Sequence, residues 1–146
     1  MAVTDKLPDL IGKSPLRIDV HEKVTGAALY TDDIQFGNKL LYARVKRSTV
    51  PHALIKSIDT SKAEALPGVK VVVTGKDYPN KIGLYLKDKN IFAYKRVRFV
   101  GEAVAGVAAV TEEIAEKACE LIEVEYEELE PVFDAEYGAS ADAPLI

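Results

Sequence analysis

The stretch that most resembles a chemical site runs from Arg96 to Ala118, where an apolar run with two glycines meets the start of a helix. A glycine-rich turn between a strand and a helix can hold the phosphates of a dinucleotide, and its fingerprint is G-x-G-x-x-G within that turn. Here Gly101 precedes the predicted strand and Gly106 lies inside it. The turn itself has no glycine, and Glu112 and Glu113 would repel a phosphate at the helix N-terminus. We therefore interpret the glycines as turn and packing residues rather than as nucleotide ligands.

Two motifs nearer the N-terminus are incomplete. Gly12-Lys13-Ser14 matches the end of a phosphate-binding loop, but Leu7 occupies the position of the first glycine and Pro15 removes a backbone amide. His21-Glu22 matches the start of the zinc motif H-E-x-x-H, but Thr25 stands where the second histidine belongs. We interpret both segments as polar surface.

The remaining candidates are a carboxylate pair and two single side chains. Asp32-Asp33 lacks the further ligands that calcium or magnesium requires. His52 follows Pro51 in a loop and is interpreted as bonded to backbone rather than catalytic. Cys119 lies beside the apolar stripe of a predicted helix and is interpreted as a buried, inert thiol. The sequence therefore predicts no catalytic, cofactor-binding or metal-binding residue in this chain.

The composition is that of a soluble globular domain. The chain has 146 residues, enough for one core, and is 48% hydrophobic and 29% charged. A net charge of −4 argues against binding to nucleic acid or to an anionic membrane. No apolar run approaches the ~18 residues of a membrane span, and the first residues lack the apolar core of a signal peptide. We expect a cytoplasmic protein.

The helices and strands predicted along the chain follow one another in an order typical of an α+β domain. A short helix is predicted near 61–66, with Ser61 and Glu64 as a capping box, and a longer one near 111–123, with Thr111 as N-cap. A short strand followed by a turn is expected within Lys23–Ile34, and another short strand near Leu84–Leu86. The remaining predicted strands are Leu40–Arg47, Ala53–Ile58, Val69–Thr74, Val97–Val100, Ala103–Val110 and Glu123–Glu127.

The strand Ala103–Val110 is apolar throughout, so we expect it at the centre of a sheet with both faces covered. Its side chains are small, and whatever covers them must approach closely. Gly101 is predicted to be a turn or bulge residue at the start of this strand.

Three stretches carry a family resemblance through their order and spacing: RIDVHEKVTGAALYTDDI, SIDTSKAEALPGVKVVVTGKD and RVRFVGEAVAGVAAVTEEIAEKACELIEVEYEELEPVFD. They resemble the N-terminal region of the molybdenum-binding large subunits of the xanthine dehydrogenase and aldehyde oxidase family. Within it they look most like the large subunits of the 4-hydroxybenzoyl-CoA reductase and nicotinate hydroxylase kind. The resemblance covers about Gly12 to Asp134, nearly the whole chain.

The resemblance implies an α/β-hammerhead fold, in which two helices pack on mixed β-strands beside a projecting β-hammerhead. The expected organisation is an extended lead-in over 1–20, the hammerhead domain over 21–134, and a loose tail over 135–146 leading to cofactor-binding domains. In this family a molybdenum–pterin cofactor is held by later domains of the same subunit, with 2Fe-2S and FAD on partner domains or subunits. No cofactor is expected in this chain.

The resemblance implies a structural and interface role within a molybdenum hydroxylase, with no catalysis by the isolated chain. Its partners would be the remaining molybdenum-binding domains and the iron–sulfur and flavin subunits. The alternative is a free-standing interaction or assembly module with the same fold. The substrate, the oligomeric state, and whether the chain is a truncated piece or a separately encoded subunit stay open.

A module that acts through contact should expose an apolar surface for its neighbours. We expect such a surface to cause self-association or crystal contacts in the isolated domain. The residues with no evident place in the core are Phe36, Leu84, Tyr85, Leu86, Ile91 and Phe92.

Overall fold

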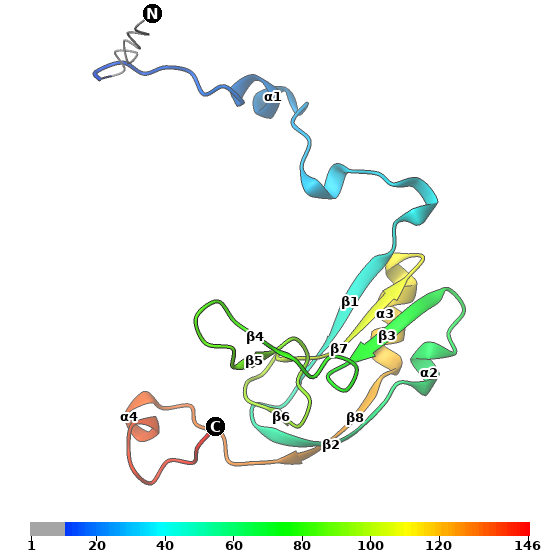
Figure 1. The fold of residues 1–146 in the computed structure, drawn as a ribbon, viewed down its shortest axis with the longest axis vertical. Helices are drawn as coiled ribbons and strands as arrows, with labels where there is room; N and C mark the ends of the chain where they lie inside the picture. The colour runs from blue at the N-terminus through cyan, green and yellow to red at the C-terminus, as the bar shows by residue number, and fades with distance from the viewer. Residues whose placement is uncertain (1–10) are drawn as a thin grey trace, which may run out of the picture. The chain divides into compact units, whose positions relative to one another are not determined.

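The computed structural model describes residues 11–146, which fall into two units divided after Asn38 (Figure 1). The described part of the first unit contains the helix α1 (Val20–Thr25) and the 3₁₀ turn η1 (Thr31–Asp33). A second 3₁₀ turn, η2 (Gly37–Lys39), spans the division between the units. The strands and the remaining helices belong to the second unit.

The first unit differs from the sequence prediction, because Lys23–Ile34 contains helical turns and no strand. Helix α1 ends where Gly26 adopts a left-handed φ of +76°, and the Gly26 N–H donates to the carbonyls of Glu22 and Lys23. Lys23 also forms an ion pair with Asp19 at 2.9 Å, one helical turn earlier. These local interactions, which alternation of apolar residues does not reveal, favour the helix.

A three-stranded antiparallel sheet lies at the centre of the second unit. Its strand order is β1 (Tyr42–Arg47), β7 (Ala103–Ala109) and β3 (Val69–Thr74). The predicted central place of β7 is thus confirmed. Its Ala105, Val107 and Ala109 side chains are buried toward one face, where α2 (Ser61–Glu64) and α3 (Glu112–Leu121) lie.

The helices cover this face through a core of small side chains. Ala63 of α2 and Ala118 of α3 pack with Ala105, Val107 and Ile122, all nearly fully buried. The predicted N-cap of α3 is confirmed, because the Thr111 hydroxyl accepts a hydrogen bond from the Ile114 N–H at 3.3 Å. Small residues allow the helices to approach the sheet closely.

The capping box predicted for α2 does not form as expected. The N-cap is Thr60, whose hydroxyl donates to Glu64 at 2.5 Å, while the Ser61 hydroxyl donates to Asp59 at 2.6 Å. The Ser61 hydroxyl is thus engaged with Asp59, and α2 begins at the N-cap position Thr60 without a side-chain cap hydrogen bond.

A second antiparallel sheet has the order β6 (Arg96–Val97), β2 (Ala53–Asp59) and β8 (Glu123–Glu128). Its core contains Ala53, Ala93 and Val97 together with Val104, which points from β7 to the side opposite Ala105. The described strands pair antiparallel throughout rather than in a mixed arrangement, and the expected α+β class is confirmed.

A two-stranded hairpin, β4 (Lys81–Ile82) and β5 (Lys89–Asn90), projects from the second unit (Figure 1). The strand predicted near Leu84–Leu86 is wrong, since these residues form the exposed turn between β4 and β5. The predicted strand Val97–Val100 is also too long: Phe99 and Val100 are exposed at 58% and 62%, so no neighbouring strand or core holds them. The tail beyond Asp134 forms a short helix, α4 (Ala135–Gly138), whose first turn is capped by the Asp134 carboxylate.

Candidate functional site

Gly101 and Gly106, the glycines that suggested a phosphate turn, serve conformation and packing. Gly101 has a φ of +89° in the turn before β7, which glycine adopts most easily. A Cβ placed on Gly106 would lie 2.7 Å from Cζ of Phe92, so the aromatic ring covers this glycine directly. The packing interpretation of Gly106 is confirmed.

The incomplete N-terminal motifs lie in exposed segments of the first unit. His21 and Glu22 are on the exposed helix α1, and Asp33 accepts a hydrogen bond from the Tyr30 N–H at 2.8 Å. Leu7, which breaks the phosphate-loop pattern, lies outside the described residues. Within residues 11–146, His, Cys, Asp and Glu side chains nowhere form a group of three that could hold a metal ion.

Cys119, a residue of α3, is half-buried against the core rather than fully buried. Burial raises the pKa of its thiol above 9.0, although Lys46 and Arg44 nearby oppose that effect. A raised pKa lowers the thiolate fraction near neutral pH, so the thiol is a poor nucleophile.

His52 is the buried polar side chain of most interest, because only 3% of it is exposed. Its Nδ1 lies 2.7 Å from the backbone oxygen of Glu130, which confirms the predicted bond to backbone. A carbonyl oxygen can only accept, so Nδ1 carries the proton of that bond. The other ring nitrogen, Nε2, is buried with no hydrogen-bond partner among the described residues. An orphaned buried acceptor of this kind requires an explanation.

His52 lines a small recess of about 240 Å³, called here the smaller recess. Its lining residues are mostly apolar, and three of them are highly accessible: Phe99 at 58%, Val100 at 62% and Phe133 at 82%. The other apolar residues lining it are Pro51, Pro131, Val132 and Ile146.

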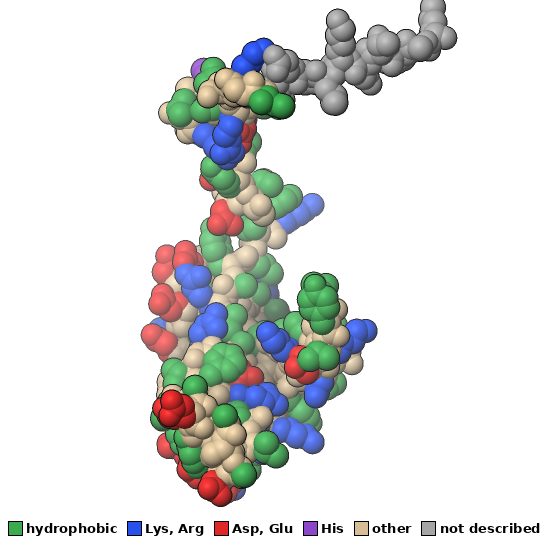
Figure 2. Space-filling model, turned by 90° about the vertical axis from the view of Figure 1, so that its left-hand side faces the viewer, with side chains coloured by type: hydrophobic (Ala, Val, Ile, Leu, Met, Phe, Trp, Pro, Cys, Tyr) green, Lys and Arg blue, Asp and Glu red, His purple; other side chains and the backbone are tan. Residues whose placement is uncertain are grey.

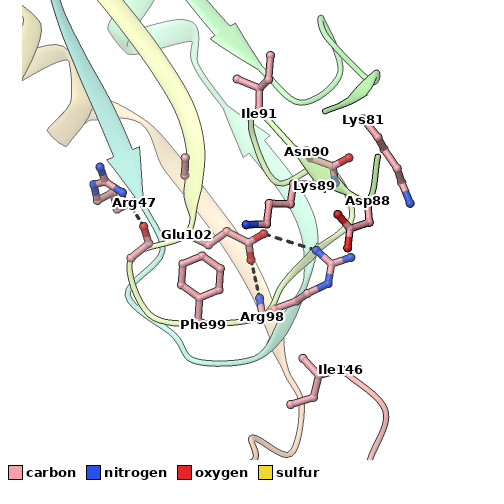
Figure 3. A pocket seen from close by; sticks show the side chains of 12 residues that line it. Arg47, Lys81, Asp88, Lys89, Asn90, Ile91, Arg98, Phe99, Glu102 and Ile146 are labelled. Atoms are coloured by element: carbon pink, nitrogen blue, oxygen red, sulfur yellow. Dashed lines mark hydrogen bonds and ion pairs between the residues drawn. The ribbon is translucent and has the colours of Figure 1, made fainter. Parts of the chain in front are cut away.

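A larger recess of about 670 Å³ adjoins the smaller one and shares Arg98, Phe99 and Ile146 with it (Figure 3). The residues that line it come from the hairpin β4–β5, the connection between β6 and β7, and the end of β1. Its charged residues are four cations and two acids: Arg47, Lys81, Lys89, Arg98, Asp88 and Glu102.

Two of these cations are already engaged. Arg47 donates to the Gly101 carbonyl at 2.9 Å. Arg98 contacts Glu102 through its guanidinium at 3.5 Å, and the same carboxylate accepts from the Arg98 N–H at 2.6 Å, as Figure 3 shows. Lys81 and Lys89 are exposed, so the larger recess is a basic surface on an acidic protein.

Charge is also unevenly spread over the second unit. In the view of Figure 2, acidic side chains gather along one edge with some Lys and Arg side chains among them, and Lys and Arg side chains predominate along the other. Helix α3 and strand β8 supply many of the acids: Glu112, Glu113, Glu116, Glu120, Glu123, Glu125, Glu127 and Glu128. Three of these acids are already paired within the chain, Glu112 with Arg44, Glu123 with Lys62 and Glu127 with Lys56, so the acidic edge is partly neutralised.

Most of the side chains expected to form a partner surface are exposed. Leu84, Tyr85 and Leu86 are 89%, 93% and 71% accessible at the hairpin turn, and Phe36 and Ile91 are also exposed. Phe92 is the exception, since it is half-buried against Gly106. Sequence reasoning missed Phe99, Val100 and Phe133, although an apolar pair just before the turn glycine Gly101 was an available signal.

No helix within residues 11–146 is both long and apolar enough to cross a membrane.

Comparison with known proteins gives the chain's family. The sequence model described as "Aldehyde oxidase and xanthine dehydrogenase, a/b hammerhead domain" matches residues 25–130. A probable xanthine dehydrogenase subunit of Bacillus subtilis (strain 168) is 51% identical over 119 residues, which is 80% of this chain and 16% of that protein. The nicotinate dehydrogenase large molybdopterin subunit of Eubacterium barkeri is 42% identical over 139 residues, 94% of this chain and 32% of that one.

The solved structures agree with the sequence relatives. A crystal structure of the Cu,Mo-CO dehydrogenase superimposes with a TM-score of 0.85 at 36% identity, over 92% of this chain and 17% of that chain. The chain therefore belongs to the aldehyde oxidase and xanthine dehydrogenase family and corresponds to its hammerhead domain, as the resemblance predicted. It spans only 16% and 32% of the two curated relatives described above.

Proposed function

We propose that this chain is the N-terminal hammerhead domain of the molybdenum-binding large subunit of a molybdenum hydroxylase. Its role there is structural and interfacial, and it performs no catalysis alone. The observation that carries the proposal is the family match over residues 25–130, combined with the small share of each relative that the chain spans. The rest of such a subunit is polypeptide that this domain must contact.

The parent reaction would be the hydroxylation of an aldehyde or an N-heterocycle, or a related reduction. The names of the relatives, which include a nicotinate dehydrogenase and a xanthine dehydrogenase, support this reaction class. The molybdenum–pterin cofactor would be held by other domains of the large subunit, with iron–sulfur and flavin groups on partner subunits in the cytoplasm. We assign this chain no step of the reaction.

A chimera tests the proposal directly. In the Bacillus subtilis relative, the matching segment of 119 aligned residues would be replaced by the part of this chain that aligns with it, which is 80% of its length. We expect a soluble chimera that co-purifies with molybdenum in the same ratio as the unmodified relative, whereas the 146-residue chain purified alone carries no stoichiometric molybdenum, iron or flavin. A chimera that stays insoluble, or a lone chain with one tightly bound equivalent of any of these groups, would contradict the proposal.

A further inference from the structure

We propose that the outer edge of strand β3 pairs with β3 of a second copy of this chain, antiparallel and about a two-fold axis at Val72. Two backbone hydrogen bonds join the two Val72 residues, and Lys70 of each copy lies beside Asp77 of the other. Because the contact joins two copies of the same chain, it does not rest on the proposed function.

Strand β3 lies at an edge of the central sheet, with β7 on one side of it (Figure 1). Within residues 11–146 no strand pairs with its other side. A groove of about 380 Å³ is lined by residues 69–72 and by Glu64 of α2, and Val71 in this groove is 47% exposed. This part of the strand is therefore accessible, and an accessible strand edge offers its backbone N–H and C=O groups to another strand.

The turn after β3 shows which backbone groups of the strand point outward. The Thr74 N–H donates to the Asp77 carboxylate at 2.7 Å, and the Thr74 carbonyl accepts from the Asp77 N–H at 3.2 Å. Both groups of Thr74 are thus directed away from β7. In an antiparallel pair, the side to which a residue directs its N–H and C=O alternates from one residue to the next. The register with β7 is regular from Val71 onward, so Val72 also directs both groups outward.

A two-fold axis at Val72 makes this edge complementary to itself. Two such residues that lie directly opposite each other in an antiparallel pair exchange both N–H···O=C bonds. Val72 of each copy therefore donates to Val72 of the other and accepts from it. The same register sets Val71 opposite Val73 of the other copy, and β-branched side chains pack well across neighbouring strands.

The same register brings opposite charges together. Lys70 comes to lie opposite Thr74 of the other copy, where the Asp77 carboxylate accepts from the outward N–H and the hydroxyl of Thr74. The two Lys70 side chains are four positions apart along the strands, about 13 Å, which weakens their mutual repulsion. Because the register of β3 is irregular at Lys70, we assign this residue an ion pair and no backbone bond.

The longer edge strands β1 and β8 are poorly suited to pairing with themselves. Like charges placed opposite each other destabilise a strand pair. Strand β3 has one charged residue among six, Lys70. In contrast, β1 has three cations and β8 has four acids: Arg44, Lys46, Arg47, Glu123, Glu125, Glu127 and Glu128. A second copy of the chain is therefore matched better by β3 than by β1 or β8.

The test measures self-association of the 146-residue chain by sedimentation equilibrium. A short contact of this kind is a weak interface, so the concentration range extends to about 1 mM. Lys70→Glu places an acid beside Asp77 of the other copy, and Asp77→Lys places a cation beside Lys70. We expect each change to raise the Kd of the dimer at least about tenfold. Lys117→Glu is the matched control, because it reverses an exposed lysine on α3 and should leave the Kd unchanged.

An equimolar mixture of Lys70→Glu and Asp77→Lys tests the register. In a mixed pair one contact joins the introduced glutamate to the introduced lysine, and the other joins the original Lys70 to the original Asp77. We therefore expect the mixture to recover the association of the unmodified chain. Where Asp77→Lys does not fold, Asp77→Asn takes its place, because its amide oxygen still accepts from Thr74, and it should recover association in part. A mixture without recovery would show that the two-fold register is wrong.

Amide hydrogen exchange tests the backbone contact without any substitution. The Val72 N–H should exchange quickly in dilute solution and slowly in concentrated solution, whereas the Val73 N–H, which faces β7, should be protected in both. Equal protection of Val72 at both concentrations, or a chain that stays monomeric throughout, would overturn the proposal. Association that Lys70→Glu leaves unchanged would place the contact elsewhere, for example at the exposed turn between β4 and β5, and would overturn it too. The chimera experiment is independent of these results, so this proposal and the proposed function can fail separately.

Discussion

Replacing Gly106 by valine tests how closely Phe92 covers the face of the central sheet opposite the helices. Gly106 lies in the middle of β7, between Val45 of β1 and Val73 of β3. A Cβ at this position would lie 2.7 Å from Cζ and 3.2 Å from Cε1 of Phe92. Ordinary contacts begin near 3.4 Å, so the Phe92 ring must move before any side chain fits.

The expected cost follows from this overlap. The φ of Gly106 is not in the left-handed region, so the backbone accepts valine without strain, and the loss comes from packing alone. Overpacking a tight site costs about 1–3 kcal/mol. For a domain of this size, that loss lowers the melting midpoint by about 4–12 °C. The half-buried Phe92 can relieve part of the overlap by turning outward, which keeps the loss below that of a clash with backbone.

A double-mutant cycle identifies the cause. In a Phe92→Ala background the ring is absent, and valine should then fit between Val45 and Val73, as β-branched residues do in strands. We expect a coupling free energy between Gly106→Val and Phe92→Ala of at least about 1 kcal/mol, measured by thermal or urea unfolding. An unchanged midpoint for Gly106→Val would show that the glycine faces open space. An equal loss in both backgrounds would show that Phe92 is not what limits the site.

Three further predictions concern the same unit. Gly75→Ala should cost more than Gly106→Val, at least about 2 kcal/mol by urea unfolding, because the new Cβ would meet backbone atoms of residues 92–94 at 2.8–2.9 Å; an equal or smaller loss would contradict this. Thr111→Ala should remove the N-cap of α3 and cost about 1 kcal/mol, while Thr111→Ser should restore most of it. Hydrogen bonds from the Thr74 N–H and hydroxyl hold the pKa of Asp77 below its usual 3.8, so their stabilisation is present above that pH and is lost as the pH falls through the lowered value. Asp77→Asn should therefore reduce the loss of stability on acidification, and identical acid-unfolding curves for the variant and the unmodified chain would refute that role.

The parts of the fold that sequence predicts well are those whose signals are local. The apolar run of β7 and the cap and stripe of α3 each require only neighbouring residues, and both are found as predicted apart from their last residue or two. The first unit was predicted less well, since its helix α1 depends on a glycine cap and an ion pair with Asp19 rather than on a periodic apolar pattern. In the hairpin, a continuous apolar run at Leu84–Leu86 gave a strand signal for what is an exposed turn.

The smaller recess could not have been predicted from local patterns, because the residues that line it are distant from one another in sequence. His52 is fixed by the backbone of Glu130, which lies 78 positions away, and that contact alone determines which ring nitrogen is left over. Phe99 gave a strand signal, and only the structure shows that it joins His52 and Phe133 instead of a core.

Sequence motifs associated with catalysis or cofactor binding were a poor guide to the role of this chain, because the structure gives the residues in them other roles. Its glycines lie where an aromatic ring or a turn requires them, and its cysteine has a pKa that burial raises. The unsatisfied groups are of a different kind: a buried imidazole nitrogen, exposed phenylalanines and lysines in a basic recess. An enzyme active site positions reactive groups against a substrate, whereas these groups need only a hydrogen-bond donor, apolar cover and negative charge. The family match over residues 25–130 supports a place for this domain within a larger subunit, and its exposed apolar side chains suit contact with further polypeptide rather than a step of the reaction.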